Sequence, residues 1–212
     1  MFRSFSIRFL LALILFSGMA VGASGAPVVL VLGDSLSAGF GMGTKESWVT
    51  LLEERLADQG YEHRVINASA SGETTGGARA RLPRALELHS PEVVIIELGG
   101  NYALRGLPLP QVRDNLAAMV QMSLDQGARV LLVGMHVPPN YGPAYTRAFH
   151  AVYGDVAQGF AIPLVPFFLE GVALDPALMQ DDGIHPNALA QPRLLENVWP
   201  ALEPLLERST ES

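Results

Sequence analysis

Apolar runs that alternate with helical patterns limit the folds open to this chain more than any other feature of its sequence. Residues 28–32 (VVLVL) and 93–98 (VVIIEL) are rich in β-branched residues and lack polar alternation, as in strands that are covered on both faces. Shorter runs predict three further strands at residues 63–67, 130–133 and 162–165.

Segments with apolar residues at helical spacing lie between these runs. Residues 47–59 are one such segment, with Ser47 as the expected N-cap and Gly60 as the stop. The other predicted helices cover residues 75–89, 110–126, 144–158 and 188–207. Pro83 is expected to kink or split the first of these. Strand–helix alternation at this spacing predicts βαβ units, and therefore an α/β fold with a parallel sheet and helices on both faces.

The N-terminus has the three parts of a secretory signal peptide. Arg3 and Arg8 precede an apolar stretch at residues 9–21, and small residues follow it. The stretch is short for a membrane span of ~20 residues, and an uncleaved anchor is the alternative. We therefore expect residues 1–25 to be cleaved, with cleavage after Ala23 or Gly25. The mature domain at 26–212 would be secreted or periplasmic, without stable membrane insertion.

Charge and cysteine content exclude several function classes. The chain has no cysteine, so disulfides, cysteine metal sites and a cysteine nucleophile are ruled out. The net charge is −7 and no run of Lys or Arg stands out, so the basic face that nucleic acid requires is missing. An apolar content of 49% with 17% charged residues is typical of a globular domain.

Residues suited to acyl transfer follow the first three predicted strands. Ser35 comes after the first, in Gly-Asp-Ser, where it is well placed as a nucleophile, although such a serine is also typical of a turn or an N-cap. Gly72 follows the second strand and can offer its N–H to an anion, and Asn101 follows the third and can donate its side-chain amide. Both are also common loop residues. In parallel sheets of this class the site forms outside the carboxyl ends of the strands.

An Asp–His pair near the C-terminus supplies a base. Asp182 can reach the Nδ1–H of His185, three residues on, and leave Nε2 free to take a proton from a serine hydroxyl. One alternative is a capped helix start with an incidental histidine. Another is a cation held by Asp181, Asp182 and His185, but no further ligand lies at an evident spacing, and no metal is expected. Together the residues supply every role that acyl transfer needs.

Four blocks of the sequence, GDSLSAGFG, NASASGETTGG, ELGGN and DDGIHP, resemble the SGNH (GDSL) hydrolase superfamily in order and spacing. The resemblance runs through essentially the whole mature chain, and it is greatest to the bacterial periplasmic thioesterase I, lysophospholipase L1 and arylesterase group. It implies a three-layer α/β/α, flavodoxin-like sandwich with a five-stranded parallel sheet. It also implies a serine esterase or thioesterase that cleaves acyl esters without a metal or organic cofactor.

The resemblance also implies roles for single residues. Ser35 matches the nucleophile, and its N–H joins the oxyanion hole with the N–H of Gly72 and the side chain of Asn101. His185 matches the general base and Asp182 the residue that orients it. The loop after the third block and the VPP segment would border the acyl groove. The expected substrate-binding residues are Tyr102, Leu104, Val137 and Pro138.

One position departs from the family pattern. The family usually has Asp directly after the Asn of the third block, where this chain has Tyr102. The exchange puts the rate and the substrate range in doubt more than the reaction type. The expected partner is therefore a small-molecule acyl ester or thioester, acted on by a monomer. Two rival functions stay open: a carbohydrate deacetylase of the same fold, and a secreted binding protein that lost turnover because of Tyr102.

Overall fold

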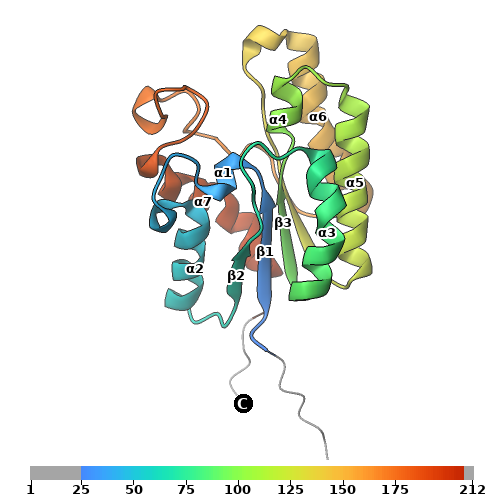
Figure 1. The fold of residues 1–212 in the computed structure, drawn as a ribbon, viewed down its shortest axis with the longest axis vertical. Helices are drawn as coiled ribbons and strands as arrows, with labels where there is room; N and C mark the ends of the chain where they lie inside the picture. Colours follow the sequence, from blue (N-terminus) through green and yellow to red (C-terminus); the bar gives the residue numbers. More distant parts are fainter. Residues whose placement is uncertain (1–24, 208–212) are drawn as a thin grey trace, which may run out of the picture.

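The computed structural model describes residues 25–207 of the chain, and within them five parallel strands form a single sheet (Figure 1). The strands are β1 (Val28–Gly33), β2 (Arg64–Asn67), β3 (Val93–Glu97), β4 (Arg129–Val133) and β5 (Leu164–Val165). Their order is β2-β1-β3-β4-β5 and each neighbouring pair is parallel. This is the flavodoxin-like order, so the predicted sheet is confirmed.

Helices cover both faces of the sheet. The α-helices are α1 (Ser35–Ala38), α2 (Trp48–Asp58), α3 (Thr75–His89), α4 (Gly100–Leu104), α5 (Leu109–Asp125), α6 (Pro143–Phe160) and α7 (Gln191–Leu202). Short 3₁₀ turns lie at Thr44–Glu46, Pro139–Tyr141, Pro176–Leu178, Ala188–Ala190 and Glu203–Leu205. Helices α2 and α7 pack together on one side, and α3, α5 and α6 on the other, which confirms the three layers (Figure 1).

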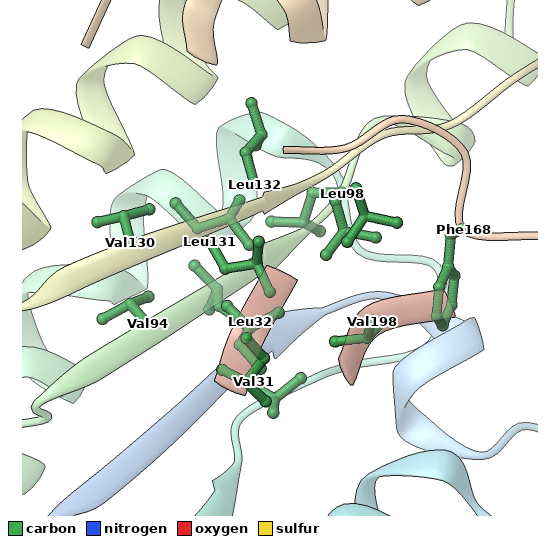
Figure 2. Packing of buried hydrophobic residues seen from close by; sticks show 14 of the residues in the cluster. Val31, Leu32, Val94, Leu98, Val130, Leu131, Leu132, Phe168 and Val198 are labelled. Atoms are coloured by element: carbon green, nitrogen blue, oxygen red, sulfur yellow. The ribbon is translucent and has the colours of Figure 1, made fainter. Parts of the chain in front are cut away.

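The core lies on both sides of the two central strands. All residues of β1 and β3 are buried, whereas β2 at the sheet edge is only half-buried. Figure 2 shows Val31, Val94 and Leu131 from neighbouring strands packed together, with Phe168 and Val198 close by. Burial on both faces explains why the central strands are continuous apolar runs rather than alternating ones.

The ends of α2 follow the predicted signals, whereas two other helices differ from the prediction. Ser47 caps α2 by accepting from the N–H of Thr50, and Gly60 takes the left-handed φ of 77° just after the helix, as expected. Helix α3, in contrast, runs through Pro83 without a break, so the predicted split is wrong. Pro83 is exposed, and water can replace the backbone hydrogen bond that proline removes. The helix predicted at 188–207 is shorter, because 3₁₀ turns replace both of its ends.

The carboxyl ends of the strands meet at one edge of the sheet. β1 leads into α1, β3 leads into α4, and the turn after β2 is tied to the end of β1 by the Ala70 N–H, 3.1 Å from the Gly33 carbonyl oxygen. No helix within residues 25–207 is long and apolar enough to cross a membrane. The predicted signal peptide lies outside the described residues, apart from Gly25, and stays a prediction.

Candidate active site

The serine predicted as nucleophile is the first residue of α1, directly after β1. Ser35 is 8% exposed, and its backbone N–H stands at a helix start, where no partner exists within the helix. The preceding Asp34 caps α1 by accepting from the N–H of Leu36 at 3.1 Å. Position 33 requires glycine because the Glu97 side chain lies close to it, and a Cβ there would lie 2.9 Å from Glu97 Oε2.

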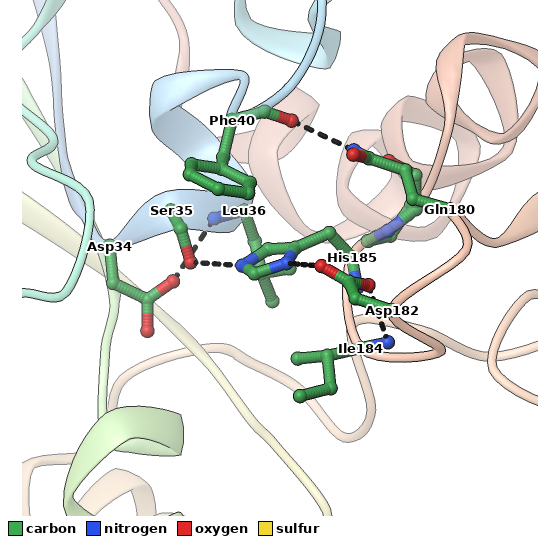
Figure 3. A network of polar contacts seen from close by, with 9 residues as sticks. Asp34, Ser35, Leu36, Phe40, Gln180, Asp182, Ile184 and His185 are labelled. Carbon is green, nitrogen blue, oxygen red and sulfur yellow. Dashed lines mark hydrogen bonds and ion pairs between the residues drawn. The ribbon is translucent and has the colours of Figure 1, made fainter.

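The structure brings His185 and Asp182 to this serine (Figure 3). His185 Nε2 lies 2.9 Å from Ser35 Oγ, and His185 Nδ1 lies 2.6 Å from Asp182 Oδ2. The other oxygen of Asp182 accepts the backbone N–H groups of Ile184 and His185, both at 2.9 Å. The backbone N–H of His185, followed by its ring, lowers the pKa of Asp182 to about 2. The carboxylate is therefore charged at neutral pH and holds the imidazole in one orientation.

The two predicted oxyanion donors follow β3 and β2, and Asn101 contacts the residue before the serine. Asn101 lies in α4, and its Nδ2 donates to Asp34 Oδ2 at 3.0 Å. A primary amide carries two hydrogens, so this bond fixes the amide while the second N–H stays available to a substrate oxygen. Gly72 is exposed in the turn after β2, with a left-handed φ of 77° that favours glycine.

A buried acid that the sequence did not single out lies beneath the nucleophile. Glu97 is fully buried, and its Oε2 accepts from Ser37 Oγ at 2.7 Å, which in turn accepts from Trp48 Nε1 at 3.2 Å. Its Oε1 has no hydrogen-bond partner among residues 25–207. Burial, together with the nearby Asp34, raises the pKa of Glu97 well above its usual value. The glutamate inside the apolar run VVIIEL was the signal available in the sequence.

Asp34 is the second buried acid of the site. It is 2% exposed, and burial raises its pKa to about 6, although the Leu36 N–H and Asn101 favour the charged form. The sequence prediction treated Asp34 as part of the turn only. Its contact with Asn101 joins residues that are 67 positions apart, which no local pattern reports.

The residues predicted to bind substrate differ in exposure. Val137 and Tyr102 are buried, whereas Leu104 is half-buried and Pro138 exposed. The Tyr102 hydroxyl donates to Gln111 of α5, so its ring packs away from Asn101 rather than over it. Substrate contact by these four residues stays a prediction.

Two tyrosines bind the segment after Asn101, Tyr141 from the 3₁₀ turn Pro139–Tyr141 and Tyr145 from α6. The Tyr141 hydroxyl donates to the Leu104 carbonyl at 2.8 Å, and the Tyr145 hydroxyl lies 3.3 Å from the Ala103 carbonyl and 3.2 Å from that of Leu107. These contacts fix the backbone of the segment that contains Leu104.

A metal centre has no ligand set in the described part of the chain. No group of three or more His, Asp or Glu side chains within residues 25–207 is arranged to hold an ion. The cation alternative for Asp181, Asp182 and His185 therefore lacks a geometric basis.

Sequence comparison finds a family match over most of the chain. The model of the GDSL-like lipase/acylhydrolase family matches residues 31–191. The esterase TesA of Pseudomonas aeruginosa is 55% identical over 196 residues, 92% of this chain and 96% of the relative. The thioesterase 1/protease 1/lysophospholipase L1 of Escherichia coli K12 is 42% identical over 188 residues, 89% of each chain.

Structural comparison gives the same result. The crystal structure of TesA is similar with a TM-score of 0.83 at 56% identity, over 84% of this chain and 99% of that one. The residues matched by the family model include Ser35, Gly72, Asn101, Asp182 and His185. The similarity therefore spans the site as well as the sheet.

Proposed function

Because the chain belongs to the GDSL-like lipase/acylhydrolase family, we propose that it is a serine hydrolase that cleaves carboxylic esters and thioesters of acyl chains through an acyl-enzyme on Ser35. One observation carries this proposal: Ser35 Oγ lies 2.9 Å from His185 Nε2, while Nδ1 of the same ring lies 2.6 Å from Asp182. This arrangement supports the assignment of Ser35 as nucleophile, His185 as base and Asp182 as the orienting carboxylate of acyl transfer.

The reaction has two halves. His185 Nε2 takes the proton of Ser35 as its Oγ attacks the acyl carbonyl, and Asp182 stabilises the imidazolium that forms. The tetrahedral intermediate then collapses, and the alcohol or thiol leaves with the proton from His185. Water, deprotonated by the same base, releases the acid from Ser35 and restores the enzyme.

The oxyanion would be held by three donors. They are the N–H of Ser35, the N–H of Gly72 and the second hydrogen of the Asn101 amide, whose first hydrogen is bound to Asp34. Every group in this scheme is a side chain or backbone atom of the chain, so the proposal needs no cofactor.

The acyl part of the substrate is proposed to lie along Leu104 and Pro138, which are at least partly exposed. Tyr102 and Val137 would support that surface from beneath, because both are buried. The names of the relatives, esterase and thioesterase/lysophospholipase, support acyl esters and thioesters of small molecules as the substrate class.

We further propose that the mature protein is exported and acts as a monomer. The charged, apolar and small-residue parts of residues 1–25 support export. A Tyr102 side chain in the oxyanion site would favour the binding-protein alternative, but its hydroxyl is bound to Gln111 instead, which supports the hydrolase.

The test is hydrolysis of p-nitrophenyl esters from acetate to palmitate by the mature protein and by Ser35→Ala. We expect turnover by the wild type and a loss of at least about 10⁴-fold in the variant. A chain-length optimum beyond acetate supports an acyl hydrolase, whereas activity confined to acetate supports the deacetylase. No turnover of any ester by the wild type would contradict the proposed function.

A further inference from the structure

The contact between Ser35 and His185 joins two segments with separate supports. The turn after β1 is anchored to the sheet, because Ser37 binds Glu97 and its carbonyl accepts from Asn67 Nδ2 at 2.8 Å. The segment at residues 177–187, which carries His185, is instead closed on itself. Gln180 N donates to the His185 carbonyl at 2.7 Å, and an isolated antiparallel bridge pairs Met179 with Pro186. The distance between the serine turn and the segment at residues 177–187 must therefore be set by a contact that joins them.

The side chain of Gln180 links the two segments directly (Figure 3). Its Nε2 donates to the Phe40 carbonyl at 2.8 Å and to the Pro186 carbonyl at 3.0 Å. Phe40 follows α1 on the nucleophile side, and Pro186 follows the base. Among the described residues, this amide joins the two segments directly, beside the Ser35–His185 contact itself. A second amide, that of Gln191, binds the Asn187 carbonyl and accepts from the Trp48 N–H at the start of α2, so it links the base segment to the nucleophile side only through Trp48.

Gly41 and Phe40 lie next to the Gln180 side chain, and each has a feature that depends on its position. Gly41 has a φ of 75°, and a Cβ there would lie 2.2 Å from Gln180 Oε1, so any larger residue would displace the amide. The Phe40 ring lies 4.5 Å from the His185 ring, tilted by 37°. Because Gln180 holds the carbonyl of Phe40, it also fixes the backbone that presents this ring to the imidazole.

We propose that Gln180 is a positioning residue that sets the Ser35–His185 distance and holds Phe40 against the imidazole. The inference rests on the proposed function, since it assigns Gln180 to the proton transfer between those two residues. An amide is needed because two carbonyls must each receive a hydrogen, and neither a thioether nor a carboxylate can donate both. Proton transfer requires hydrogen-bond reach, and a displacement of about 1 Å lowers rates by roughly 10²-fold.

The first test replaces the amide with a side chain of similar length that cannot donate. We expect Gln180→Met to lower kcat for p-nitrophenyl esters by roughly 10- to 100-fold, with KM within about 2-fold. Gln121→Met is the matched control, because Gln121 is exposed on α5 and its amide binds the neighbouring Asp125 at 2.7 Å, with no other hydrogen bond within residues 25–207. The control should keep the wild-type kcat.

A second readout separates positioning from damage to the segment. The proton between Asp182 and His185 Nδ1 should keep its low-field NMR resonance in Gln180→Met, because that pair closes within the segment. Labelling of Ser35 by a fluorophosphonate should slow as much as kcat falls. Loss of the resonance together with the activity would show a merely structural role and overturn the proposal.

A second pair of variants tests the bridge without altering Gln180. Gly41→Ala and Gly60→Ala introduce a Cβ at nearly the same strained φ, 75° and 77°, but only at position 41 does it meet Gln180, since nothing lies within 4 Å at position 60. We expect a fall in kcat for Gly41→Ala alone. Equal kcat in the two glycine variants, or in the two Met variants, would overturn the positioning role of Gln180. The proposed function would still stand in that case, provided that the wild type turns over esters. An inactive wild type would instead contradict the proposed function.

Discussion

The two aspartates nearest the Ser35–His185 contact lie in opposite environments. Asp34 is 2% exposed at the end of β1, and burial raises its pKa to about 6. The Asp182 side chain is 39% exposed, and hydrogen bonds from its own neighbours lower its pKa to about 2. The two carboxyl groups thus differ in pKa for different reasons. Loss of solvation raises the pKa of Asp34, whereas hydrogen bonds from nearby donors lower the pKa of Asp182.

The difference shows that the nucleophile and the base of the proposed site are held by two separate parts of the chain. The nucleophile side is built from the sheet core, where Asp34, Ser37 and Glu97 form contacts between residues distant in sequence. The base side is built from one short segment, in which Asp182 binds groups two and three residues away. Three predictions test this division, in order of decreasing effect.

The largest effect is expected on the base side. Asp182→Asn keeps an oxygen for the backbone N–H groups but presents an amide to His185 Nδ1, which favours the wrong tautomer. We expect kcat to fall by about 10⁴-fold. Asp181→Asn removes the same charge from an exposed neighbour and should change kcat less than about 3-fold, given the small effect of exposed charges. Similar losses in both would show that overall charge, not the Asp182 contact, matters.

A smaller effect is expected on the nucleophile side. Asp34→Asn leaves one oxygen for two donors, the Leu36 N–H and the Asn101 amide, and removes the charge. We expect the contact that orients Asn101 to be lost, so that its donor is withdrawn from the oxyanion. We expect a loss of about 10²- to 10³-fold in kcat, the size of one oxyanion donor. Asn101→Ala should lose about as much, and the double variant no more. Losses that multiply would show that the two residues act separately.

The smallest effect is expected on stability, with opposite signs for the two carboxylates. The pKa of Asp34 is raised from 3.8 to about 6, so the folded state binds more protons and stability falls as pH rises through that range. The pKa of Asp182 is lowered to about 2, so its contribution is present above pH ~4 and is lost as pH falls toward 2.

Urea unfolding from pH 3 to 8 measures both contributions. Relative to wild type, Asp34→Asn should gain stability between pH 4 and 6, by at most about 3 kcal/mol. Asp182→Asn should be destabilised at neutral pH, by an amount that shrinks in acid and is small because the group is exposed. Parallel curves for Asp34→Asn and wild type would show that Asp34 is not buried as described.

The sheet and the position of the site could be predicted because they follow from local patterns. Continuous apolar runs mark β1 and β3, and the rule that sites form at the carboxyl ends of parallel strands brought Ser35, Gly72 and Asn101 together. Asp182 and His185 are near enough in sequence for their contact to be inferred.

Contacts across the chain could not be predicted in this way. The partner of Asn101 is 67 residues away and that of Gln180 is 140 residues away, so no periodicity links them. Helix α4 was missed because five residues are too few to show a helical period. The direction of the Tyr102 side chain depends on Gln111 in the next helix, a tertiary contact that overrides local preference.

The order of the segments along the chain has a consequence for synthesis. Ser35 follows the first strand, whereas its base comes after the last strand, 150 residues later. A nascent chain that ends before His185 contains the residues of all five strands and Ser35, but lacks the proposed base. If the proposed mechanism holds, full hydrolytic activity is therefore expected only when the last segment has docked.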